Sequence, residues 1–291
     1  MRFANYYNDN FTLAKKGWVK SVTLVILSRK GFDGKAGGKP SPVYEGRFRS
    51  FPIPFANSGV FYRDMKFNKT HSYLDVMMDL GITQYSECHL DPDLHKEVLI
   101  RDSDWEPIFG QSGGQETSLQ KERVGEGDIF LFFGWFKHVS FSDGRFQYEQ
   151  RFSGDDGFHA IYGYLEVGET VDLRQGDRIP SYAKQHPHVL ESSRRTGSNR
   201  LYIAKRAGTF RFNQELVLTR DEKTRSCWRL PPFFESIGID KFRQKTTRTD
   251  GEGLCVNFTG RGSQELLIEK HPDLVDWSER FIKLYGIPSK I

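Results

Sequence analysis

The sequence is poor in cysteine and lacks the common phosphate-binding motifs. Its three cysteines, Cys88, Cys227 and Cys255, are far apart and include no C-x-x-C pair. This pattern excludes a disulfide scaffold and a cysteine zinc site, and it indicates a reducing compartment. The chain has no G-x-x-x-x-G-K-[ST] phosphate loop and no G-x-G-x-x-G fingerprint, so P-loop and dinucleotide-fold chemistry are not expected.

Long apolar runs and strong net charge are also missing. No run approaches the ~18 apolar residues of a membrane helix, and the N-terminal residues lack the apolar core of a signal peptide. We therefore expect a cytoplasmic protein without a membrane partner. The net charge of +4 permits a polyanionic partner but does not require one. Nothing in the sequence predicts the oligomeric state.

Aromatic residues are abundant, and they concentrate in one central stretch. The 24 Phe, 12 Tyr and 5 Trp give an apolar run at 129–136 and another at 158–167. Gly127-Asp128 precedes the first run, and Asp143-Gly144 between the runs is a hairpin signal. Such runs favour strands buried on both faces.

These patterns predict an α+β fold: a mixed, strongly curved or barrel-like sheet with few helices. The clearest helix spans residues 272–285, where Leu274, Trp277, Phe281, Leu284 and Tyr285 form one apolar stripe. A short helix is expected at 71–80 and another at 116–123. We expect residues 1–20 to be a loosely ordered lead-in and residues 21–291 to form one domain.

Two short strings carry the residues best suited to catalysis or metal binding. His89, Asp91 and Asp93 alternate, so an extended chain turns all three to one face. They suit a metal, acid–base chemistry or ribose hydroxyls; the alternative is an Asp-Pro turn that caps the next segment. His186 and His188 flank Pro187, and we expect an extended segment with both rings on one face. Imidazoles that are neutral near pH 7 can bind metal or transfer a proton.

A second group of polar residues suits a nucleotide. The loop 28–43 follows a predicted strand and is rich in glycine and basic residues, as phosphate-binding loops are. Loop amides present both a donor and an acceptor, which suits the edge of a base. The alternative for each residue is ordinary loop closure or, for the strand histidine, core packing. The expected nucleotide-binding residues are Arg29, Lys30, Asp33, Gln111, Gln115, His159, Arg261, Gln264 and Glu265.

Several strings in combination resemble a bacterial and phage family, the nucleotide modification associated domain, type three. They are spread over residues 22–280 and include SRKGFD, GGKPSP, HLDPD, FGQ, GDIFLFFGWF and HPH. The resemblance implies a nucleotide context rather than a particular reaction. A looser similarity is to PUA-like barrels of the EVE and ASCH kind, which hold a base, and it rests on GDIFLFF and IYGYLEV. This chain is about twice as long as such a module.

Three functions remain open at this point. The first is a protein that binds a nucleotide or nucleic acid, DNA rather than RNA, in connection with base modification, with or without an enzymatic step of its own. The second is a mononuclear Fe²⁺-dependent oxygenase with ligands His89, Asp91 and either His186 or His188, a two-histidine, one-carboxylate set. A metal-free variant uses Asp91 or Asp93 as base and a histidine as acid. The third is a modified-base reader or adaptor without chemistry.

Overall fold

The computed structural model describes residues 23–190, 197–220, 224–225, 227–238, 241, 247–249, 254–256 and 264–289. The expected lead-in at 1–20 and Arg261 lie outside these ranges.

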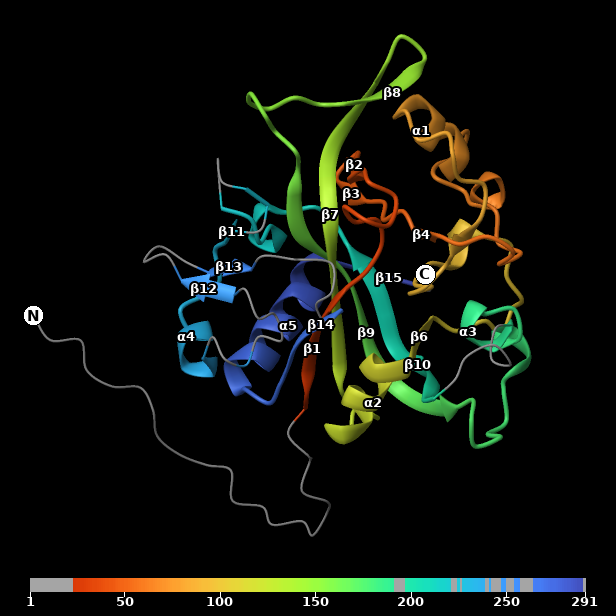
Figure 1. Cartoon of the computed structure of the whole chain (residues 1–291), viewed down its shortest axis with the longest axis vertical. Coiled ribbons are helices and arrows are strands. Elements are labelled where there is room, and N and C mark those ends of the chain that lie inside the picture. Colours follow the sequence, from red (N-terminus) through yellow and green to blue (C-terminus); the bar gives the residue numbers. More distant parts are fainter. Residues whose placement is uncertain are drawn as a thin grey trace, which may run out of the picture.

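A mixed sheet that curls into a half-barrel dominates the described chain (Figure 1). Its main strand order is β14-β1-β7-β9-β10-β15, and β2, β3, β6 and β8 attach to this path. β1 and β2 run parallel to β7, whereas the other pairs are antiparallel. The strand bounds are Val25–Arg29 (β1), Ser41–Tyr44 (β2), Arg47–Phe48 (β3), Ile108–Ser112 (β6), Ile129–Ser142 (β7), Arg145–Tyr148 (β8), Phe158–Asp172 (β9), Asn199–Phe210 (β10), Glu265–Glu269 (β14) and Gly286–Pro288 (β15).

The two aromatic runs form the longest strands, as the sequence predicts. β7 is buried without interruption from Ile129 to Lys137, because β1 and β9 flank it and other elements cover both faces. Asp143 and Gly144 have φ values of 53° and 74°, so they form the tight turn that joins β7 to β8. In the Gly127-Asp128 turn, the Asp128 carboxylate accepts bonds from the amides of Leu24 (2.7 Å) and Gly125 (2.9 Å).

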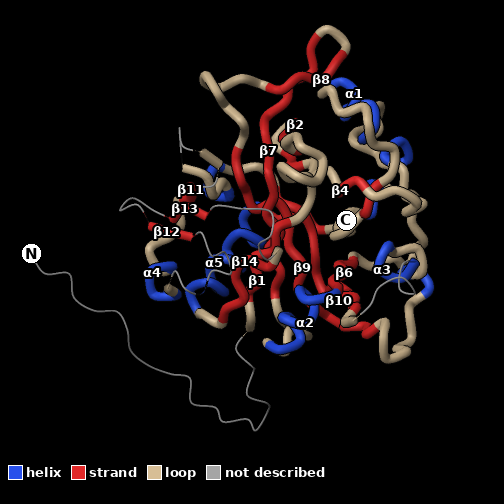
Figure 2. Tube along the Cα trace, viewed as in Figure 1, coloured by secondary structure: helices blue, strands red, loops and turns tan. Residues whose placement is uncertain are grey.

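The helices are few and lie outside the sheet (Figure 2). α1 (Tyr73–Asp79) begins with a capping box between Ser72 and Asp75. α5 (Pro272–Tyr285) packs on β1, β10 and β15 and buries Leu274, Trp277 and Phe281. Leu284 of the predicted stripe is exposed instead, because it turns away from the sheet. The remaining helices are α2 (Gly113–Lys121), α3 (Pro187–Leu190) and α4 (Phe234–Ile237), with single 3-10 turns at Tyr62–Asp64, Lys96–Val98, Ser181–Ala183 and Gln214–Leu216.

Local predictions fail at two places. The His186–His188 segment is not extended: α3 begins at Pro187, since proline is favoured at the first position of a helix. Gln111 and Gln115 are not loop residues, because the former lies in β6 and the latter in α2. Smaller sheets pair β4 (Ile53–Pro54) with β5 (Cys88–His89), and β11 (Cys227–Trp228) and β12 (Thr247–Thr249) with β13 (Leu254–Val256).

Two aromatic cores support the fold. The larger one lies around β1, β7, β9 and α5. The second lies under α1 and includes Phe51, Tyr62, Phe67 and Tyr73, so the segment 50–98 packs as a cap against the end of the sheet. Among the described residues, no helix is long and apolar enough to cross a membrane.

Candidate functional site

Three histidines surround the buried carboxylate of Asp91. The Nε2 atoms of His89 and His188 lie 3.8 and 3.6 Å from Asp91 Oδ2, and Nε2 of His186 lies 3.5 Å from Asp91 Oδ1. The four side chains are at most 9% exposed. Ligand atoms of His89, Asp91 and His188 all lie within 4.8 Å of one another. Residues about 100 positions apart thus form one polar cluster.

The edge of the sheet brings the two strings together. Asp93 forms an isolated bridge with Ile108, with mutual backbone hydrogen bonds of 2.9 and 3.1 Å. This antiparallel register sets Asp91 beside Gly110, whose amide donates to Asp91 Oδ1 at 2.8 Å. On its other side β6 pairs with β10, and α3 packs on both strands. β6 therefore holds Asp91 in place and supports His186 and His188 at the start of α3.

Gly110 lets the histidines approach the strand. A Cβ atom at this position would lie 2.5 Å from Cδ2 of His188 and 2.9 Å from Cε1 of His186. Ordinary carbon contacts are about 3.5–4.0 Å. Only glycine therefore fits beneath these rings in their observed positions.

Asn199 fixes the orientation and tautomer of His188. Its Nδ2 donates to the His188 carbonyl at 3.1 Å, so its Oδ1 faces His188 Nδ1 at 2.8 Å. Nδ1 must carry a proton to make this bond. In a neutral ring, Nε2 then presents a lone pair toward Asp91. Two electron-pair donors that face each other in a buried site require a proton or a cation between them.

His186 has the opposite tautomer. Its Nδ1 accepts a bond from the backbone amide of His188 at 3.3 Å, so the proton of the neutral ring is on Nε2, which faces Asp91. His89 lies on the other side of Asp91, with its ring 5.2 Å from that of His188 and 5.7 Å from Phe55. The two candidate rings that face the same oxygen of Asp91 are thus His89 and His188.

The pKa values of the two neighbouring carboxylates, Asp91 and Asp93, are shifted in opposite directions. Burial alone raises the pKa of Asp91, but the hydrogen bond from His186 and the charges of the three histidines outweigh it and hold the pKa well below its usual range. Burial raises the pKa of Asp93 to about 6, although Arg101 opposes this shift. Arg101 Nη2 lies 2.7 and 2.6 Å from the two oxygens of Asp93. Asp93 therefore points to Arg101 rather than into the histidine cluster.

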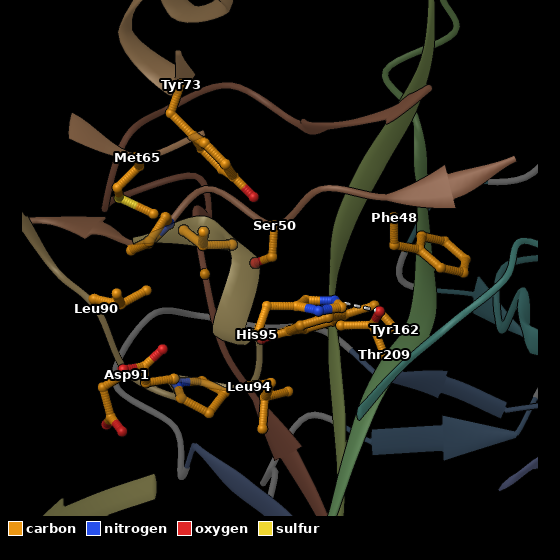
Figure 3. A pocket seen from close by; sticks show the side chains of 15 residues that line it. Phe48, Ser50, Met65, Tyr73, Leu90, Asp91, Leu94, His95, Tyr162 and Thr209 are labelled. Carbon is orange, nitrogen blue, oxygen red and sulfur yellow. Dashed lines mark hydrogen bonds between the residues drawn. The ribbon is translucent and has the colours of Figure 1, made fainter. Parts of the chain in front are cut away.

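Two hollows adjoin the cluster. A small cavity of about 50 Å³ is lined by Asp91 and by Tyr73 of α1, which lie at opposite ends of it (Figure 3). His95 and Thr209 border it and share a hydrogen bond of 2.6 Å. A groove of about 600 Å³ lies on the side of His186 and Asp93. We call it the histidine groove, and its wall includes Phe61, Lys66, Arg101, Trp105, Tyr182 and Gln185.

Part of the expected nucleotide-binding set forms a separate cluster around Glu265. The Oε1 atom of Glu265 accepts bonds from Gln111 (2.8 Å) and Ser28 (3.0 Å), and Lys30 Nζ lies 3.5 Å away. Lys30 also donates to Gln264 at 3.0 Å. Alternate strand residues point to opposite faces, so Gln111 leaves β6 on the face opposite to the histidines that crowd Gly110. The two clusters are therefore separated by β6 and do not form one cleft.

The other predicted nucleotide-binding residues make contacts within the fold. Arg29 pairs with Asp33 at 3.3 Å, and Asp33 also accepts bonds from the amides of Lys35 and Ala36 in its own loop. His159 is buried, and its Nδ1 accepts a bond from Trp228 at 3.1 Å. Burial lowers the pKa of His159 to about 3, so the ring is neutral. Gln115 lies in the first half of α2.

Sequence reasoning missed Asn199, Arg101 and the spacing role of Gly110. None carries a local signal, since Asn199 opens an ordinary strand and Arg101 is one of many basic residues. It also missed that residues 110–114 read G-x-S-x-G at a strand-to-helix junction. Ser112 has extended backbone angles of −145° and 168°, unlike the strained turn of a nucleophile elbow. We assign no hydrolase site to it.

A comparison with protein families agrees with the nucleotide context. No curated protein and no solved structure matches the chain, so the looser likeness to PUA-like barrels rests on sequence strings alone. A family model described as nucleotide modification associated domain 3 matches residues 24–267. This match includes both histidine strings and nearly the whole sheet. The chain therefore belongs to the nucleotide modification associated domain 3 family.

Proposed function

We propose that this protein is a metal-dependent enzyme that acts on a nucleotide or on a base in a nucleic acid. The observation that carries the proposal is the meeting of His89 Nε2, Asp91 Oδ2 and His188 Nε2 around one buried point. Two histidines and one carboxylate are the ligand set of non-haem Fe²⁺ sites, which keep positions open for other ligands. The family supplies the nucleotide context.

The distances within this set support a metal site. Two ligands about 2.1 Å from one ion lie about 3.4 Å apart in a tetrahedral site and about 3.0 Å apart in an octahedral site. The observed contacts of Asp91 with His188 and His89 are 3.6 and 3.8 Å. Both contacts are within a few tenths of an ångström of the tetrahedral spacing, and the ligand atoms of all three residues lie within 4.8 Å of one another, so the set would draw together around an ion. Asn199 supplies the outer hydrogen bond that metal-binding histidines usually make.

His186, the histidine outside the proposed ligand set, has a different proposed role. His186 borders the histidine groove and carries its neutral-state proton on Nε2, 3.5 Å from Asp91. With Nδ1 bonded to the His188 amide and Nε2 facing Asp91, His186 would orient this carboxylate and exchange a proton with it. A bound Fe²⁺ would supply Lewis acidity or oxygen chemistry. Tyr182 in the groove wall would pack against a base.

The second candidate function is metal-free acid–base chemistry. The favouring observation is the direct Asp91–His186 contact of 3.5 Å at the edge of the groove. In that case, Asp91 would act as the base, and His186 would share the proton with it. Metal analysis separates the two candidates, because only the first requires one ion per chain.

The test is metal binding by the full-length protein. Protein purified without chelator is analysed for metal content, and apo protein is titrated with Fe²⁺ under anaerobic conditions and with Mn²⁺. We expect one ion per chain, with at least a 100-fold loss of affinity in Asp91→Asn and His188→Gln. The matched control is His271→Gln, since His271 lies at the start of α5, away from the cluster. No binding of Fe²⁺ or Mn²⁺ by wild-type protein would refute the metal site.

A further inference from the structure

A basic groove of about 1210 Å³ lies next to the histidine groove. Three segments line it: the β2–β3 hairpin, residues 63–72 before α1, and residues 95–99. Its basic residues are Arg47, Arg49, Arg63, Lys66, Lys69 and Lys96, against the acidic residues Glu45, Asp64 and Glu97. The chain as a whole is only mildly basic, so this groove holds a local excess of positive charge.

Five of the six cations of this groove form no ion pair with any residue that the structure describes. Within the part of the chain that the structure describes, only Arg63 has a carboxylate partner within 4 Å, its neighbour Asp64. The other five, Arg47, Arg49, Lys66, Lys69 and Lys96, have none there. Unpaired cations gathered around a hollow offer sites for an anionic ligand.

The same positive charge acts on His95 at the border of the groove. Burial lowers the pKa of His95 to about 4, and the charges of Arg49 and Arg47 add to this effect. His95 is therefore neutral near pH 7, and its Nε2 shares a hydrogen bond with the hydroxyl of Thr209. Phe141, 43% exposed, adds an aromatic ring at the rim and packs against His71 at 5.2 Å.

The groove is larger than typical small-molecule pockets and continues toward the candidate metal ligands. Small-molecule pockets are typically about 300–1,000 Å³, and this groove exceeds that range before the histidine groove is added. The two grooves share Asp64, Lys66 and Leu99 in their walls. The histidine groove then reaches His186. A chain of phosphates in the basic groove would thus extend to within reach of the candidate site.

We propose that the basic groove binds the sugar–phosphate backbone of a nucleic-acid strand and directs one base into the histidine groove. This inference rests on the proposed function and narrows its substrate class to a strand rather than a free nucleotide. Enzymes that act on a base within a strand must take that base out of the stack. Phe141 offers a ring on which a neighbouring base stacks.

The test compares two triple variants in strand binding. Arg47→Gln, Lys66→Gln and Lys69→Gln remove three exposed cations of the groove. Lys121→Gln, Lys270→Gln and Lys283→Gln remove three exposed cations elsewhere and match the change in net charge. A fluorescein-labelled DNA strand of about 20 nucleotides and the same RNA sequence are titrated by anisotropy from roughly 50 to 200 mM NaCl.

Each phosphate contact adds about 0.7 to the salt slope of single-strand binding, so three lost contacts lower the slope by about 2 and the affinity by about 100-fold near 0.1 M salt. We expect this loss in the groove variant and less than a threefold change in the control. A free mononucleotide at equal phosphate concentration should not displace the strand. Equal weakening of both variants, an unchanged groove variant, or displacement by the mononucleotide would overturn the proposal.

Metal binding is measured on the same samples. The groove variant should retain the metal content of wild-type protein, because its three substitutions lie outside the histidine cluster. If wild-type protein binds the strand but no metal, the proposed function is refuted, whereas the proposal that the basic groove binds a strand is retained. If it binds metal but no strand, the proposal for the basic groove is refuted and the proposed metal site is retained.

Discussion

Gly110→Ala is the sharpest test of the geometry around Asp91. The added methyl would lie 2.5 Å from Cδ2 of His188 and 2.9 Å from Cε1 of His186. To restore an ordinary contact of about 3.5 Å, the His188 ring must retreat by about 1 Å. Metal–ligand distances tolerate only about 0.2 Å, so the ring can no longer lie near Asp91 as a ligand.

The expected result has two parts. Overpacking of this kind costs about 1–3 kcal/mol of unfolding free energy, which chemical denaturation detects. Affinity for Mn²⁺, measured by calorimetry, should fall at least 100-fold, because one of three ligands is displaced. The matched control is Gly114→Ala in α2, where an added Cβ meets nothing within 4 Å. That variant should keep wild-type metal binding and at least wild-type stability.

A Gly110→Ala variant with the stability and metal affinity of the Gly114→Ala control would refute the reasoning. It would mean that the histidine rings do not lie over β6 as described. A loss of stability with unchanged metal affinity would retain the packing argument and remove His188 from the ligand set.

Three other predictions concern the polar groups around the site and in the core. Asn199→Ala removes the partner of His188 Nδ1, and we expect a 10–100-fold loss of Mn²⁺ affinity, whereas an unchanged affinity would contradict the assigned tautomer. Lys30→Met removes the cation 3.5 Å from the carboxylate of Glu265, which is 0% exposed, and leaves it, among the described residues, the charge of Arg29 alone; we expect the free energy of unfolding in urea to fall by up to about 3–5 kcal/mol, with relief in the Lys30→Met, Glu265→Gln double variant. Burial raises the pKa of Glu116 from 4.5 to about 7, so the folded state holds its proton more tightly than the unfolded state. Its contribution to stability, on the order of 3 kcal/mol, is present below pH about 4.5 and lost as pH rises through about 7; Glu116→Gln should flatten this part of the stability–pH profile, and a profile identical to wild type would refute the assignment.

The sequence alone determined most of the sheet. The runs at 129–136 and 158–167 could be predicted as central strands, because apolar length and aromatic content are local properties that do not depend on distant residues. The Asp143-Gly144 turn and the helix at 272–285 follow from equally local signals. Predictions failed where the same residues suit two different local structures. The HPH string suited an extended segment, but Pro187 instead begins a helix.

The composition of the site was determined only in part. The sequence identified His89, Asp91, His186 and His188 as candidate residues because of their chemistry and spacing. Tertiary structure decided which of them meet: the pairing of Asp93 with Ile108 and of β6 with β10 brings residues 89–91 to α3. It also decided that Glu265 and Gln111 lie across β6 from them. Strand pairing joins residues far apart in the chain, and no pattern within a short segment encodes which distant segments will pair.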